Sequence, residues 1–85
     1  MAKCTIRYWA AAKEAAGIAE DTVLAATLGE ALEAARRLHS DDRFQRVLGV
    51  SSFLVDEKPV GRRAHGDVPV TDGTVIEVLP PFAGG

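Results

Sequence analysis

Residues 3 to 9 alternate between apolar and more polar positions. One face of this segment carries Cys4, Ile6 and Tyr8, and the opposite face ends with Trp9. A period of two is typical of a strand that is buried on one face. The pattern therefore predicts a first strand with Cys4 and Tyr8 in the core and Trp9 on the outer face.

Alanines at positions 10 to 12 and 15 to 16 follow this strand, and Gly17 ends the segment. We expect a single helical turn or a loop there. Val23 and Leu24 then favour a second short strand over residues 21–26, although their β pattern is weaker than that of the first strand.

Helical periodicity begins at residue 28. Thr27 and Glu30 have the spacing of a capping box, in which a hydroxyl and a carboxylate cap the same helix end. This predicts the main helix over about residues 28–39. Its apolar positions are Leu28, Ala31, Leu32, Ala35 and Leu38.

A second, shorter helix is predicted over about residues 41–48. Ser40, Asp41 and Asp42 can cap its start, and Gly49 is well placed to end it. Its apolar side chains are Phe44, Val47 and Leu48.

The remainder of the chain reads as strands and turns. We expect a strand over 52–55, a turn into a short edge strand near Val60, an exposed loop over 61–67 and a turn at 72–73. Residues 74–79, TVIEVL, form the strongest β run. Pro80 and Pro81 must stop that strand, because proline cannot donate a hydrogen bond to a sheet.

This order predicts an α+β fold, a ββαββ mixed sheet with one main helix and a short second helix. The first two strands should pair antiparallel, and the last strand should lie parallel to the first after a helical crossover. That is the β-grasp (ubiquitin-like) architecture, which hosts several unrelated functions. We expect a single β-grasp domain over 1–79 and a flexible C-terminal PPFAGG tail over 80–85.

Composition limits the possible functions. The chain has 85 residues and a net charge of −2, which argues against general nucleic-acid binding because that needs a basic surface. Cys4 is the only cysteine, so one chain cannot form a disulfide, a cysteine-ligated zinc site or a four-cysteine iron–sulfur cluster. A cytoplasmic location without membrane attachment fits, since Arg7, Lys13 and Glu14 interrupt the apolar start before a signal sequence could form.

The titratable side chains do not form a catalytic set in the sequence. Free cysteine usually behaves as a small buried hydrophobe, so Cys4 is expected in the core. His39 falls at a helix C-terminus and His65 in a loop. Four arginines (Arg36, Arg37, Arg43 and Arg46) alternate with Glu33, Asp41 and Asp42 and predict a solvated face. We therefore expect a non-enzymatic protein that carries chemistry without performing it, and no metal site.

Three segments resemble the MoaD/ThiS family of ubiquitin-like sulfur carriers, and the resemblance covers essentially the whole chain. They are IRYWAAAKEAAG (6–17), TLGEAL (27–32) and VTDGTVIEVLPPFAGG (70–85). The last is the most specific, because a DG turn, a β run, two prolines and a terminal glycine pair follow in that order. The family often has phenylalanine at the position of Trp9, asparagine at Asp56 and valine at Phe82.

The resemblance implies a reactive C-terminus at Gly85. In the family, an E1-like adenylating enzyme uses ATP to adenylate the terminal glycine, and a sulfur donor then displaces AMP to leave a thiocarboxylate. Glycines can enter a narrow channel, whereas prolines keep a tail extended. The tail would comprise Pro80, Pro81, Phe82, Ala83 and Gly84 before the reactive Gly85, which needs no protease to expose it. No permanently bound cofactor is implied.

The leading function implied by the resemblance is the sulfur-donor subunit of molybdopterin synthase, acting in molybdenum cofactor biosynthesis with a larger catalytic (MoaE-like) subunit. A carrier for thiamine, cysteine or a secondary metabolite would share the same residues. A ubiquitin-like modifier, which would join Gly85 to lysines of other proteins, is the alternative from a different class.

One partner-binding patch is expected on the outer face of the sheet. If the first and last strands are adjacent and parallel, Trp9 and Leu79 finish at the same end of that face, close to Phe82. Exposed apolar groups that gather in this way usually mark an interface. Pro59 or Val60 is expected to contribute.

Overall fold

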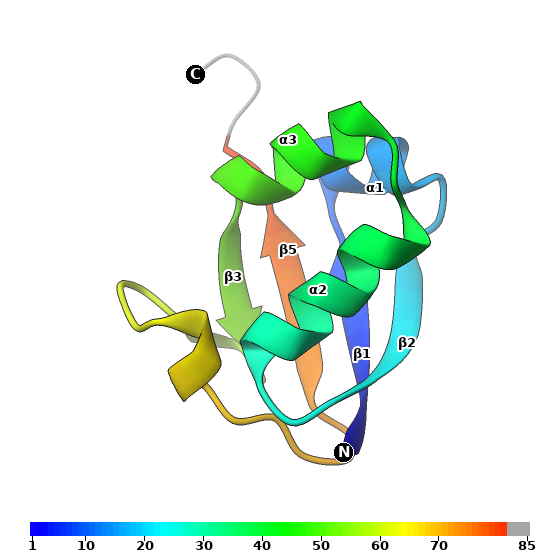
Figure 1. The fold of residues 1–85 in the computed structure, drawn as a ribbon. Helices are drawn as coiled ribbons and strands as arrows, with labels where there is room; N and C mark the ends of the chain where they lie inside the picture. Colours follow the sequence, from blue (N-terminus) through cyan, green and yellow to red (C-terminus); the bar gives the residue numbers. More distant parts are fainter. Residues whose placement is uncertain (82–85) are drawn as a thin grey trace.

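The computed structural model describes residues 1–81, which form a five-stranded mixed sheet in the order β2-β1-β5-β3-β4. Figure 1 shows α2 crossing one face of the sheet, with α1 and α3 grouped at the end where β5 finishes. The strands are β1 (Ala2–Tyr8), β2 (Glu20–Ala25), β3 (Ser52–Val55), β4 (Lys58–Pro59) and β5 (Val75–Leu79). The helices are α1 (Ala10–Ala16), α2 (Leu28–Leu38) and α3 (Asp42–Val50), with a 3-10 turn η1 (His65–Asp67).

The strand pairing confirms the predicted topology. β1 runs antiparallel to β2 and parallel to β5, with Ile6 beside Ile76, and β5 runs antiparallel to β3, with Val78 opposite Phe53. The side chains of these four residues are buried under the helices. The β-grasp sheet therefore has one apolar face covered by α2 and one outer face.

The capping box of α2 forms with one difference from the standard motif, because the Glu30 carboxylate bonds to the residue before the cap instead of to Thr27. The amide of Glu30 donates to Thr27 Oγ1 at 3.2 Å, and the Glu30 carboxylate accepts from the amide of Ala26 at 2.8 Å. Leu28 and Ala31 are buried behind this cap, as the helical period predicts, whereas Leu38, which the same period places on the apolar face, is 57% exposed at the end of the helix.

The segment after β1 is more helical than predicted. Instead of a single turn or a loop, it forms the seven-residue helix α1. The carbonyl of Trp9 accepts hydrogen bonds from Ala12 and Lys13, and Ala12 is buried against the core. Gly17, at φ 73°, ends the helix in the left-handed conformation that glycine adopts at low cost.

The sequence predicted that Gly49 would end the second helix, and this prediction is wrong. α3 continues to Val50, and Ser51 caps it: the Ser51 amide donates to the carbonyl of Leu48, and its hydroxyl donates to Val47. Because Ser51 has an extended backbone and hydrogen-bonds two carbonyl groups of the last turn, the helix ends without a glycine in the left-handed conformation.

Two further segments agree with the sequence. Residues 61–67 are exposed as expected, although they include the short turn η1. Gly73, at φ 87°, makes the predicted turn before β5, and its amide donates to the carbonyl of Lys3. Of the predicted tail, Pro80 and Pro81 are described, and residues 82–85 lie outside the described residues.

Candidate functional site

An apolar groove opens at the end of the sheet where β5 leads into Pro80. Its volume is about 770 Å³. It lies between the end of β1, the start of α1, the start of β3 and the end of β5. The residues that line it are Trp9, Ala10, Ala11, Ser52, Leu79, Pro80 and Pro81.

The groove brings together the two main residues of the predicted patch. Trp9 is 44% exposed directly after β1, and Leu79 is half-buried as the last residue of β5. They meet because β1 and β5 are parallel neighbours, so both strands end at the same edge. Phe82, the third predicted member, lies outside the described residues.

Pro59 and Val60 do not line this groove. Pro59 is exposed in the edge strand β4, where it pairs with Leu54. Val60 is only 4% exposed, and its amide donates to the carbonyl of Phe53, which directs the chain toward the helix-covered face. The expectation that Val60 contributes to an outer patch is therefore wrong.

The backbone beside Trp9 is held in an unusual conformation. Ala10 has φ 47°, in the left-handed region that side chains other than glycine rarely occupy. This conformation lets the chain pass from the extended residue Trp9 directly into α1. The turn places Ala10 and Ala11 as a small-residue wall of the groove next to the indole.

A hydrogen bond fixes the indole itself. Trp9 Nε1 donates to Glu77 Oε2 at 3.0 Å. The pair is exposed on the outer face of the sheet, where Glu77 alternates with the buried Ile76 and Val78. Sequence alternation could place both residues on that face, but it could not reveal this contact.

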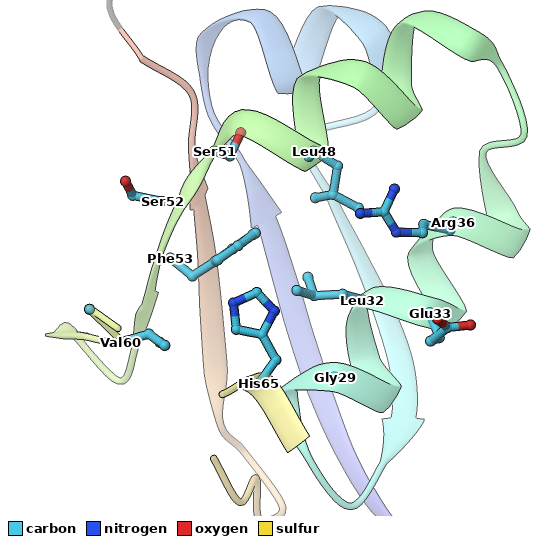
Figure 2. A pocket seen from close by; sticks show the side chains of 12 residues that line it. Gly29, Leu32, Glu33, Arg36, Leu48, Ser51, Ser52, Phe53, Val60 and His65 are labelled. Carbon is cyan, nitrogen blue, oxygen red and sulfur yellow. The ribbon is translucent and has the colours of Figure 1, made fainter. Parts of the chain in front are cut away.

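A second hollow of about 390 Å³ lies on the opposite, helix-covered side and was not predicted. Figure 2 shows the ring of His65 pointing into it between Phe53 and Leu32. The rings of His65 and Phe53 meet edge to face with centroids 5.2 Å apart. Leu32, Leu48, Phe53 and Val60 give it an apolar lining, and Glu33 and Arg36 add both signs of charge.

Cys4 occupies the core as predicted. It is 1% exposed, and burial raises the pKa of its thiol above the ordinary value. Since the thiolate is the reactive form of cysteine, this environment disfavours a nucleophilic role.

His39 has partners that the sequence analysis did not find. Its Nε2 atom lies 2.6 Å from Asp21 Oδ2, and the hydroxyl of Tyr8 donates to the same oxygen at 2.7 Å. Burial, followed by this hydrogen bond and the nearby charge of Asp21, raises the pKa of Tyr8 far above its ordinary range. Asp21 lies on the inward side of β2, in step with the buried Val23, so the alternation of β2 could have placed Asp21 on that side but could not have shown its contact with His39.

Arg37, Arg43 and Arg46 are exposed, as predicted, whereas Arg36 is half-buried, because its guanidinium donates to Gln45 Oε1 of α3 at 2.9 Å. Arg37 and Arg43 form exposed pairs with Glu33 at 4.0 Å and Glu14 at 3.6 Å. Within residues 1–81, no three side chains suited to metal binding come together, and no helix is both long and apolar enough to cross a membrane.

The comparisons with known proteins agree with this geometry. Residues 6–85 match the ThiS family. No curated protein matches the sequence. Among solved structures, small archaeal modifier protein 1 (SAMP1) from Methanosarcina acetivorans is similar with a TM-score of 0.85 and 19% identity, over 100% of this chain and 98% of that one.

Two molybdopterin-related structures are also similar. The putative molybdopterin converting factor subunit 1 from Pyrococcus furiosus has a TM-score of 0.78 and 20% identity, over 96% of this chain and 100% of that one. A chain in the complex of subunits 1 and 2 of molybdopterin-converting factor from Helicobacter pylori 26695 has a TM-score of 0.70 and 25% identity, over 98% and 99%.

Proposed function

Because this chain belongs to the ThiS family of ubiquitin-like sulfur carriers, we propose that it carries sulfur as a thiocarboxylate on Gly85 and donates it in molybdopterin biosynthesis. The observation that carries the proposal is that the family match extends through Gly85, while the described chain leads toward that residue beside an apolar groove. The fold thus supplies a rigid body with an apolar groove at the end of the sheet where Pro80 and Pro81 follow β5.

The chemistry requires activation of a carboxylate, which is a poor electrophile. One oxygen of the Gly85 carboxylate attacks the α-phosphorus of ATP in a partner adenylating enzyme, and pyrophosphate leaves. Hydrosulfide supplied by a sulfur donor then attacks the acyl carbon and AMP departs with the activated oxygen, so that sulfur replaces that oxygen in a thiocarboxylate. Glycines at 84 and 85 lack side chains that would obstruct a narrow channel.

Docking is assigned to the groove around Trp9 and Leu79. Large apolar side chains that are exposed side by side favour protein interfaces, and tryptophan is among the residues that contribute most to binding. Pro80 and Pro81 continue from the groove and favour an extended backbone, which reduces the entropy lost when a tail is bound. Phe82 and Ala83 belong to the same proposed segment.

The recipient is proposed to be a larger catalytic subunit that adds sulfur to a pterin precursor. The Helicobacter pylori structure, which contains subunits 1 and 2 of a molybdopterin-converting factor, supports a partner of this kind. Incubating the thiocarboxylate form with such a subunit and a pterin precursor should convert Gly85 back to a carboxylate. No sulfur loss with that subunit, but loss with a thiazole-forming enzyme, would favour the thiamine pathway.

A protein modifier remains the second candidate, because the solved structures that are similar include SAMP1, whose name describes a small modifier protein. In that case, activated Gly85 would form isopeptide bonds with lysines. Conjugates of increased mass in a cell extract supplied with ATP would support this function. A free thiocarboxylate without conjugates would support the carrier.

A further inference from the structure

The contact between Trp9 and Glu77 joins an exposed aromatic side chain to the middle of the sheet. Trp9 follows β1, and Glu77 lies in β5, where it pairs with Arg7. The Nε1 to Oε2 distance of 3.0 Å is that of a well-formed hydrogen bond. A charged acceptor makes such a bond stronger than a neutral one would.

Arg7, the cationic neighbour of Glu77 on β1, forms its ion pair with Glu20. Arg7 Nε donates to Glu20 Oε2 at 3.3 Å on the other side of β1. The Glu77 carboxylate instead accepts a hydrogen bond from the indole N–H of Trp9.

Glu77 acts on the groove only through Trp9. The groove is lined by the indole, whereas Glu77 lines a separate hollow of about 230 Å³ together with Arg7, Asp56, Glu57 and Val75. A partner seated in the groove would thus contact Trp9 directly, with Glu77 behind it.

The main chain at Trp9 is already fixed from both sides. Its amide donates to the carbonyl of Val78 at 3.3 Å, and its own carbonyl accepts from the amide of Ala12 at 3.0 Å. The left-handed Ala10 sets the direction of the next peptide. The two side-chain torsions of Trp9 are then the principal freedom left, and the bond to Glu77 restrains them.

We propose that Glu77 is a positioning residue that holds the Trp9 indole in its docking orientation before a partner arrives. The inference rests on the proposed function, because it concerns docking of the adenylating enzyme. Side chains that must be ordered on binding lower affinity, so an indole that is ordered in the free protein binds its partner more tightly.

The first readout concerns the free protein and requires no partner. Trp9 is the only tryptophan, so its indole N–H gives a single assignable signal in a ¹H–¹⁵N NMR spectrum. Glu77→Ala should accelerate hydrogen exchange of that N–H by roughly two- to tenfold, the effect of losing one hydrogen bond. Glu77→Gln retains an acceptor oxygen and should stay close to the wild type, as should the control Glu33→Ala, which removes an exposed carboxylate that pairs with Arg37 on α2.

The second readout is affinity for the purified adenylating enzyme, measured by titration calorimetry without ATP. Glu77→Ala should weaken binding by roughly two- to tenfold, the usual cost of ordering one side chain. Glu77→Gln should change the affinity by less than about twofold, because the glutamine oxygen can still accept the indole hydrogen bond and hold Trp9 in position. In a Trp9→Ala background, Glu77→Ala should have no further effect.

Three results would overturn the positioning role. Equal weakening by Glu77→Gln and Glu77→Ala would mean that the partner reads the charge directly. An undiminished effect of Glu77→Ala without Trp9 would mean the same, and unchanged exchange and affinity in Glu77→Ala would remove the role altogether. Failure of the proposed function is distinct, because the wild type would then acquire no sulfur from the enzyme, ATP and a sulfur source.

Discussion

The imidazole Nε2 of His39 lies 2.6 Å from Oδ2 of Asp21, in a site where the two side chains are only 17% and 14% exposed. The same oxygen accepts the hydroxyl of Tyr8. These contacts tie the C-terminus of α2 to β1 and β2, with the ring of Phe44 from α3 packed against both aromatic rings. Of the elements that this cluster joins, β1 also leads to the groove, through Trp9.

Replacing Asp21 by alanine should destabilise the protein by about 2–3 kcal/mol, because two shielded polar groups lose their shared acceptor. Urea unfolding followed by circular dichroism measures this loss. Glu20→Ala is the matched control, since Glu20 is 52% exposed in a surface ion pair with Arg7 and should cost less than about 1 kcal/mol. Equal decreases in the free energy of unfolding for the two variants would show that the buried hydrogen bonds of Asp21 stabilise the protein no more than a surface ion pair does.

Tyr8 should make stability depend on alkaline pH. Its pKa in the folded protein lies far above the unfolded value of about 10, so the folded state retains a proton that the unfolded state releases. The contribution of Tyr8 to the free energy of unfolding is therefore complete at pH values below its unfolded pKa. At higher pH this contribution falls by up to about 1.4 kcal/mol per pH unit.

Tyr8→Phe isolates this effect from other alkaline titrations. The free energy of unfolding of the wild type, minus that of Tyr8→Phe, should be constant below about pH 9 and decrease above about pH 10. The measurement is urea unfolding over a pH series. A difference that stays constant at high pH would contradict the assignment.

Cys4 should be structural. Cys4→Ala should form the Gly85 thiocarboxylate normally but unfold more easily, since the lost sulfur leaves a small cavity in the core. Intact-mass analysis and thermal unfolding test the two parts. In the folded wild type, a thiol reagent should modify Cys4 only as fast as the protein opens. Loss of sulfur loading in a folded Cys4→Ala protein would contradict the structural role and indicate that the Cys4 thiol passes sulfur to Gly85.

Trp9→Ala and Leu79→Ala should each weaken partner binding by roughly 1–3 kcal/mol, the range expected of interface anchors, with little change in stability. Titration calorimetry against the adenylating enzyme and the larger catalytic subunit measures this. Leu24→Ala is a suitable control, because Leu24 is 59% exposed on the edge strand β2, where it pairs with Lys3 at the end of β1 that is far from Trp9. If both groove variants retain full affinity for both partners, docking uses another surface.

The elements with a clear period were predictable from the sequence. Alternation assigned Cys4 and Tyr8 to the core, and the Thr27 to Glu30 spacing located the start of α2, because both signals depend on neighbouring residues. The parallel pairing of β1 and β5 followed from the crossover between them, and that pairing is what brings Trp9 to Leu79.

The features that were missed depend on contacts made after the chain folds. α1 exceeds one turn because Ala12 packs into the core, and Val60 is buried because its amide bonds to the neighbouring strand. The Asp21 and His39 pair joins residues 18 positions apart, and the Trp9 and Glu77 pair joins residues 68 apart. Such distances leave no local pattern to recognise.

The central claim is that Gly85 carries the sulfur, and intact-mass spectrometry tests it most directly. The wild type is incubated with the adenylating enzyme, ATP and a sulfur source, beside a variant that lacks Gly85 and a variant with one extra residue after it. The account predicts that the wild type exchanges one oxygen for one sulfur and that both altered proteins, still folded, do not. Sulfur loading of the protein that lacks Gly85, or none on the wild type, would contradict it.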